Sequence, residues 1–163
     1  MLRCVVFALL LGVCAGSGKQ KTKAMPQSLS RGWGDGIRWV KTYKEGLSEM
    51  VKRKKPLMVI HHQDICPHSQ ALKKAFAADK SIQKMAEKDF VMLNLLNETA
   101  DGRMAPDGHY TPRILFLDQY NTVRTELVGK FPTHLYTYEP ADMALLTQNM
   151  KKAVKAKAKK AEL

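Results

Sequence analysis

One cysteine carries the clearest chemical signal in the chain. Cys66 opens the segment Cys66-Pro67-His68-Ser69, a Cys-x-x-Cys redox motif in which serine stands at the place of the second cysteine. The apolar segment 57–60 before the motif and the helix-forming segment 69–76 after it predict a strand-to-helix turn. The N-terminus of a helix favours an anion and lowers a cysteine pKa from about 8.5 toward roughly 3.5–7.5. We therefore expect Cys66 to act as a nucleophilic thiolate.

The serine at position 69 limits what this thiolate can do. A two-cysteine oxidoreductase attacks a client disulfide with its first thiolate and is released by its second, but a hydroxyl is too weakly acidic to resolve the adduct. Cys66 is therefore expected to form mixed disulfides that last until an outside thiol attacks, which favours exchange, isomerisation or covalent holding over net oxidation. His68 is expected to stabilise the thiolate electrostatically, whereas Asp64 would raise the pKa of Cys66 if the two lie close.

The N-terminal residues have the pattern of a secretory signal peptide, predicted over residues 1–16. Arg3 precedes an apolar run over 4–13, which is too short to span a bilayer, and small residues follow it. Cleavage would remove Cys4 and Cys14 and leave Cys66 as the only cysteine. A single thiol in an oxidising compartment has no internal partner, so it must be free, capped or joined to another molecule.

The C-terminal residues Lys160, Ala161, Glu162 and Leu163 are similar to the Lys-Asp-Glu-Leu signal that a retrieval receptor reads for return to the endoplasmic reticulum. Ala161 stands at the acidic position, so retrieval is expected to be incomplete. Together with the signal peptide, this ending predicts residence in the endoplasmic reticulum lumen, with some secretion to the extracellular space.

The chain is strongly basic, with a formal net charge of +12 that becomes +11 when Arg3 is lost. Such a charge is compatible with nucleic acid, heparan or anionic lipid. The secretory signals and the lack of a nucleic-acid motif argue against nucleic acid, and no segment after residue 16 is apolar enough to cross a membrane. The lysine-rich tail over 151–163 is predicted to be a solvated, helix-prone segment.

The apolar periodicity predicts one α/β domain over residues 31–150, preceded by a disordered, flexible basic arm over 17–30. Trp33 and Trp39 are expected to anchor that arm onto the domain. The order of elements predicts a mixed central sheet flanked by helices, as in thioredoxin-like proteins. The expected helices lie over 42–53, from Pro67 to Phe76, around 82–86 after a cap at Asp79 or Ser81, and from Pro140 to Met150. The expected strands lie over 57–61, 90–96, 114–117 and 123–128. A polar loop is expected over 97–112 and a hairpin turn at 118–121.

Two further patterns bear on modification and metal binding. His61, His62, Asp64, Cys66 and His68 are residue types that bind metals, but strand alternation directs His61 and His62 to opposite faces. We therefore expect no metal and no cofactor. Asn97, with Glu98 and Thr99, forms an N-glycosylation sequon, and both a used site and an unused chance triplet remain open.

Four segments of the chain together resemble the anterior gradient proteins, which are endoplasmic-reticulum members of the protein disulfide isomerase superfamily. The segments are 29–35, 55–62, 66–74 and 138–142. The resemblance extends over nearly all of the chain from about Leu29 and implies a single thioredoxin fold. It also implies that Thr111 and Pro112 form a cis-proline pair facing the active-site turn, where Thr111 offers its backbone to an extended client chain.

The resemblance implies cysteine-rich, mucin-like secretory clients for a monothiol folding factor. It also suggests a homodimer through the helix around Tyr43–Met50. The single thiol could instead link two copies through a disulfide between their Cys66 residues. A second hypothesis is a secreted signalling protein that acts in growth or regeneration independently of the thiol, through cell-surface receptors such as dystroglycan. A third, a glutaredoxin-like protein using glutathione or an iron–sulfur cluster, is disfavoured by the secretory signals.

Overall fold

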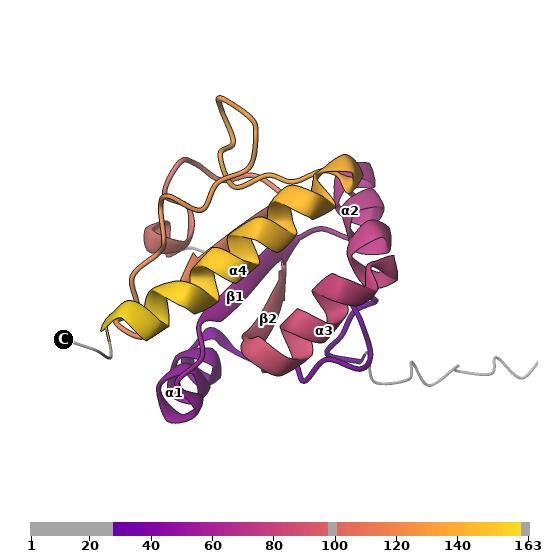
Figure 1. Ribbon diagram of the computed structural model, residues 1–163. Coiled ribbons are helices and arrows are strands. Elements are labelled where there is room, and N and C mark those ends of the chain that lie inside the picture. The colour runs from indigo at the N-terminus through magenta and orange to yellow at the C-terminus, as the bar shows by residue number, and fades with distance from the viewer. Residues whose placement is uncertain (1–27, 98–100, 161–163) are drawn as a thin grey trace, which may run out of the picture.

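A mixed β-sheet forms the centre of the computed structural model, which describes residues 28–97 and 101–160 (Figure 1). Strand β1 (Leu57–His62) lies in the middle. It pairs in parallel with β2 (Val91–Leu96) and antiparallel with β3 (Arg113–Leu117). The expected mixed sheet is thus confirmed. Residues 1–27, 98–100 and 161–163, which include the predicted signal peptide and most of the predicted arm, lie outside the described part of the chain.

Two consecutive helices carry the chain from β1 to its parallel partner β2. Parallel neighbours need such a crossover because a short hairpin cannot join them. Helix α2 (Pro67–Ala78) is followed at once by α3 (Lys80–Asp89). The carboxylate of Asp79 between them accepts hydrogen bonds from the N–H groups of Ser81 and Ile82 at 2.9 and 3.0 Å. Of the two residues that the sequence leaves open as the cap, Asp79 and Ser81, Asp79 is therefore the one that caps α3.

The helices cover both faces of the sheet, so the strands are buried on both sides and read as nearly continuous apolar runs. Helix α1 (Tyr43–Arg53) packs on one face, and α2, α3 and α4 (Met143–Lys160) pack on the other. In Figure 1, α4 and α3 cross the same face of β1 and β2. The core under these three helices is built mainly from Met58, Ile60, Leu72, Phe76, Ile82, Phe90, Met92, Ile114, Phe116, Leu146 and Met150.

Both tryptophans belong to that core. Trp33 is fully buried beside Phe76, with the ring centroids 5.4 Å apart, and the indole N–H of Trp39 donates to the carbonyl of Gly34 at 2.9 Å. Trp39 also forms an isolated parallel bridge with Met92, next to the edge of β2. The tryptophans thus fix the segment just before α1 onto the sheet.

The expected strand over 123–128 is wrong. Val123 forms only an isolated bridge with Leu117, and the N–H of Leu127 donates to the carbonyl of Arg124 at 3.1 Å, which closes a turn. Leu127 packs in the core under α2, α3 and α4, whereas Val123 packs in the core on the α1 side. A strand would direct these two residues to the same face, so the chain must turn between them.

Smaller differences concern element ends. Phe90 ends α3, so β2 begins at Val91 and not at residue 90. Short 3₁₀ turns lie at η1 (Gly102–Met104) in the predicted loop and at η2 (Pro140–Asp142), where Pro140 precedes α4.

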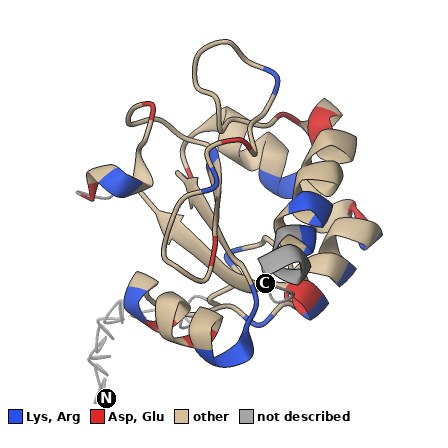
Figure 2. Cartoon of the chain, turned by 60° about the vertical axis from the view of Figure 1, so that its left-hand side comes forward, with Lys and Arg blue, Asp and Glu red and all other residues tan. Residues whose placement is uncertain are grey.

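Basic residues occur on several helices and loops and are interspersed with acidic ones (Figure 2). Helix α4 continues through the lysine-rich segment to Lys160. None of the helices in residues 28–97 and 101–160 has the length and apolarity to cross a membrane.

Candidate functional site

Cys66 lies at the N-cap of α2, and Pro67 occupies the first helical position. The backbone N–H of Cys66 donates to the carbonyl of Gln63 at 3.2 Å, and the carbonyl of Cys66 accepts from the N–H of Gln70 at 3.0 Å. The thiol is free and half-buried. The first N–H groups of a helix have no partner within the helix, so the sulfur of Cys66 lies among unused backbone donors.

The surroundings of Cys66 lower its pKa. Desolvation by burial raises the pKa, but hydrogen bonds from the Ser69 N–H, the Ser69 hydroxyl, the His68 N–H and the side chain of Thr111 oppose it, and their sum is the larger effect. Donors stabilise a thiolate because they are aimed at its charge. The thiolate expected from sequence therefore has a structural basis in the first turn of α2.

Ser69 is buried, and its hydroxyl oxygen accepts a hydrogen bond from the N–H of Gln63 at 3.3 Å. A hydroxyl has one proton to donate, and this arrangement leaves the proton of Ser69 available to the sulfur of Cys66. Serine at the place of a second cysteine thus acts as a hydrogen-bond donor to the thiolate.

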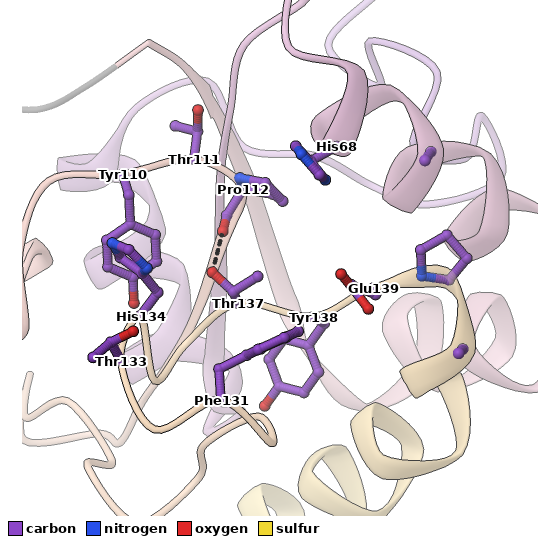
Figure 3. Close-up of a pocket in the computed structure, with 13 residues that line it drawn as sticks. His68, Tyr110, Thr111, Pro112, Phe131, Thr133, His134, Thr137, Tyr138 and Glu139 are labelled. Carbon is purple, nitrogen blue, oxygen red and sulfur yellow. Dashed lines mark hydrogen bonds between the residues drawn. The ribbon is translucent and has the colours of Figure 1, made fainter.

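His68 lies in the first turn of α2, and the electrostatic role expected of its side chain stays a prediction. The interaction that lowers the pKa of Cys66 comes from its backbone N–H. The imidazole itself is exposed and borders a pocket on the side of Pro112 (Figure 3).

Thr111 and Pro112 lie directly beside the thiol. The peptide bond between them is cis, and the Sγ atom of Cys66 lies 3.8 Å from the carbonyl oxygen of Thr111. The carbonyl of Pro112 accepts a hydrogen bond from the hydroxyl of Thr137 at 3.1 Å, which Figure 3 marks. The fold therefore brings together Cys66 and the two residues that the resemblance assigns to client binding.

A buried arginine that sequence reasoning missed holds the loop before this proline. Arg113 is the first residue of β3 and has no exposed surface. Its Nε donates to the carbonyl of Met104 at 2.9 Å, and its guanidinium donates to the carbonyl of Tyr110 at 2.7 Å. A charged side chain is buried only when it is well paired. An arginine at the head of an otherwise apolar strand is the signal that points to it.

A pocket of about 600 Å³ opens beside the proline (Figure 3). Figure 3 shows His68 on its α2 side, Tyr110 and His134 together at another side, and Phe131 near Tyr138 below. The sequence offered no local pattern for this pocket, because its walls come from segments far apart in the chain. Its lining residues are His68, Ala71, Tyr110, Thr111, Pro112, Phe131, Thr133, His134, Thr137, Tyr138, Glu139, Pro140 and Ala141.

The other titratable groups near the turn form a separate cluster. The Oδ1 atom of Asp64 lies 3.3 Å from the Nζ of Lys73 and 3.8 Å from the Nδ1 of His62. Burial lowers the pKa of His62 to about 4, and the Lys73 charge acts in the same direction. Asp64 is therefore engaged with Lys73, and the pKa of Cys66 is lowered with this carboxylate in place.

His61 and His62 do not converge on one metal position. The ring of His62 packs edge-on against Trp33 at 5.4 Å, under the helices, and its neighbour His61 faces the other side of the sheet. Across residues 28–97 and 101–160, no group of three or more His, Cys, Asp or Glu side chains is placed to hold a metal ion.

The remaining sequence-predicted sites are only partly within the described residues. Asn97 is exposed at the end of β2, and its N–H donates to the carbonyl of His62 at 2.9 Å. The other two sequon residues lie outside the described part. Of the predicted retrieval signal, only Lys160 is described, as the last residue of α4.

Comparisons with known proteins give consistent relationships. A family model described as thioredoxin-like matches residues 38–119. Anterior gradient protein 3 of Homo sapiens is 57% identical over 136 residues, which are 83% of this chain and 82% of that protein. Anterior gradient protein 2 homolog of Homo sapiens is 56% identical over 137 residues, or 84% of this chain and 78% of that protein.

A solved structure supports the fold. The solution structure of a thioredoxin from Thermus thermophilus superposes with a TM-score of 0.52 and 21% sequence identity. The superposition covers 74% of this chain and 89% of the thioredoxin. The expectation of a thioredoxin fold, made from the resemblance, is confirmed.

Proposed function

Because this chain belongs to the anterior gradient family of thioredoxin-like, disulfide isomerase-related proteins, we propose that it forms mixed disulfides with client proteins through Cys66 and so assists their folding. The observation that carries the proposal is the position of the Cys66 sulfur, 3.8 Å from the carbonyl of Thr111 and among donors that lower the pKa of the thiol. Ser69 and Thr111 support a stable thiolate, and cis-Pro112 leaves it beside a pocket.

The proposed reaction is thiol–disulfide exchange. The Cys66 thiolate attacks one sulfur of a client disulfide; a bond forms between Cys66 and that sulfur, and the second client cysteine leaves as a thiolate. The adduct is resolved when that thiolate, another client thiolate or an outside thiol attacks the mixed disulfide and Cys66 departs. Electrons are conserved throughout, so this cycle rearranges disulfides and produces no net oxidation.

The proposed compartment is the endoplasmic reticulum lumen, and the proposed clients are cysteine-rich secretory proteins of the mucin type. The signal-peptide pattern of residues 1–16 and the Lys-Ala-Glu-Leu ending support this location, with a retrieval receptor as partner. A chain with one cysteine after cleavage suits a covalent holder, because no internal thiol competes with the client for Cys66.

Trapping the adduct in secretory cells tests this function. Wild-type protein is expected to give high-mass bands on a non-reducing gel that disappear with reductant, and Cys66→Ser is expected to give none. Ser69→Cys supplies a resolving thiol and should shorten the lifetime of the adducts. Client bands that persist unchanged in Cys66→Ser would refute the proposal.

A second candidate is a secreted signalling protein, favoured by Ala161 at the acidic position of the retrieval signal. In this case purified protein added outside cells would act equally well with Cys66→Ser, through a cell-surface receptor such as dystroglycan. Retention of all the protein within cells, with none in the medium, would eliminate this candidate.

Sedimentation with and without reductant would separate a Cys66-linked dimer from one formed through α1.

A further inference from the structure

The pocket beside cis-Pro112 is continuous with the thiol site. Thr111, whose carbonyl lies 3.8 Å from the sulfur of Cys66, is also a lining residue of the pocket, as are Pro112 and His68. A client chain that reaches Cys66 across Thr111 therefore passes the mouth of this pocket. The pocket would therefore add a preference for a particular side chain near the client cysteine that reacts with Cys66.

The walls of the pocket are mainly apolar and aromatic. Three phenyl or phenol rings line it, from Tyr110, Phe131 and Tyr138, and Pro112 and Pro140 add flat apolar surface. Aromatic side chains bury large areas and gain from edge-to-face contact with other rings. A volume of about 600 Å³ is within the range of ligand pockets and exceeds what a small aliphatic side chain would fill.

The charges at the pocket argue against an ionic occupant. Among the lining residues described, none is a lysine or arginine that would pair with an acidic side chain. The one carboxylate in the lining, that of Glu139, faces the Nζ of Lys130 at 3.5 Å. A basic occupant would therefore meet a carboxylate that already has a partner. An acidic occupant would meet only the imidazoles of His68 and His134, so neither gains a permanent counter-charge in return for its lost hydration.

A hydrogen-bond network joins the two loops that form the far wall. The hydroxyl of Tyr110 donates to Asp107 at 2.8 Å and accepts from the N–H of Tyr136 at 3.0 Å. The carboxylate of Asp107 also accepts from the N–H of Leu135 at 2.6 Å. The ring of His134 lies edge-on to Tyr110 at 4.4 Å. A wall fixed in this way is formed before the client arrives, which reduces the entropy cost of binding.

We propose that this pocket binds an aromatic side chain of the client, located two residues from the cysteine that reacts with Cys66. The inference rests on the proposed function. Side chains in an extended chain alternate between faces, so the residues two positions before and after the client cysteine point to the same side as its sulfur. One of them is directed into the adjoining pocket, and the aromatic lining sets its class.

The probe is a set of synthetic peptides, each with one cysteine carried as a mixed disulfide with thionitrobenzoate. Attack by the Cys66 thiolate joins the peptide to Cys66 and releases thionitrobenzoate as a coloured thiolate, so atoms and electrons balance without an added oxidant. The peptides differ only at the position two residues before the cysteine and the position two residues after it. Each of these positions carries Phe, Ala, Glu or Lys in turn. Intact mass confirms the adduct at Cys66.

A phenylalanine at one of the two positions is expected to raise the rate constant roughly tenfold or more over alanine, as for other apolar pockets. In Phe131→Ala the ratio of the Phe rate to the Ala rate is expected to fall toward one, and Phe131→Leu should keep part of it. Tyr120→Ala is the matched control, because Tyr120 is 61% exposed and does not line the pocket. The wild-type ratio should persist there.

Three outcomes would each overturn the inference while leaving the thiol function intact. They are equal rates for the Phe and Ala peptides at both positions, a fastest reaction with the Glu or Lys peptide, and an unchanged ratio of Phe to Ala rates in folded Phe131→Ala. The absence of a Cys66 adduct with every peptide would instead refute the proposed function itself. The two failures are therefore distinguishable in a single set of measurements.

Discussion

The hydroxyl and the backbone N–H of Ser69 both act to lower the pKa of Cys66. The N–H of Gln63 occupies an acceptor site on the same hydroxyl oxygen at 3.3 Å, so the hydroxyl proton is available to the sulfur. The residue that replaces a resolving cysteine thus stabilises the attacking thiolate. In the proposed reaction the adduct is long-lived because the site lacks the thiol that would release it.

Ser69→Ala should therefore raise the pKa of Cys66. A hydrogen bond to a charged group contributes about 1.5–3 kcal/mol, or about one to two pKa units, so alkylation of Cys66 by iodoacetamide below its pKa should slow roughly ten- to hundredfold. The measurement is the alkylation rate as a function of pH. Ser81→Ala, at an exposed serine in α3, is the control and should leave the curve in place. An unshifted curve in folded Ser69→Ala would show that the hydroxyl does not act on the thiolate.

Local signals were enough to predict much of the scaffold. Pro67 and Asp79 mark helix starts by their own chemistry, and β1 is recognisable as an apolar run. The turn at Leu127 had no such local signal, because it depends on Leu127 and Val123 packing on opposite faces of the sheet. Local periodicity contains no information on that choice, and the predicted strand was wrong for this reason.

The site was predictable only in part. Cys66 was found from its motif, and its proximity to Thr111 followed from the family resemblance, since 45 residues separate the two in sequence. Phe131 and Tyr110 gave no local signal, because their role depends on how two distant loops meet. Arg113 likewise acquires its partners only when the preceding loop folds around it.

The stability of the protein should depend on the ionisation of Cys66. Its pKa is lower in the folded chain than in the unfolded chain, so folding favours the thiolate. The sulfur therefore contributes stability that is fully present above the unfolded pKa of about 8.5 and is lost as the pH falls through the folded pKa. Under reducing conditions, the difference in unfolding free energy between wild type and Cys66→Ser should grow as pH rises and then level off. A difference that is constant with pH would contradict the lowered pKa.

Removing the buried guanidinium of Arg113 should loosen the loop before cis-Pro112. Arg113→Met leaves the carbonyls of Met104 and Tyr110 without this donor, and each unsatisfied buried group costs about 1–3 kcal/mol. We expect a loss of at least about 2 kcal/mol in urea unfolding. The matched control is Arg103→Met in the same loop, because Arg103 is exposed and pairs with Asp101 at 2.8 Å. That variant should stay within about 0.5 kcal/mol of wild type. Equal losses in both variants would assign no special role to Arg113.

Ile65 should contribute to client capture through apolar contact. Its side chain is 89% exposed directly before Cys66, the largest exposure among the big apolar residues described. A client bound at the thiol covers this surface, and burial of an isoleucine contributes up to about 1.5–3 kcal/mol when complete. Ile65→Ser should therefore slow adduct formation with a cysteine-containing client roughly three- to tenfold, since the contact is only partial.

Each adduct rate is divided by the iodoacetamide alkylation rate of the same variant, which corrects for changes in the thiol itself. Val51→Ser is the matched control, because Val51 is 61% exposed on α1, and its normalised rate should equal that of wild type. If Ile65→Ser and Val51→Ser give the same normalised rate, the exposed surface beside Cys66 has no part in binding clients.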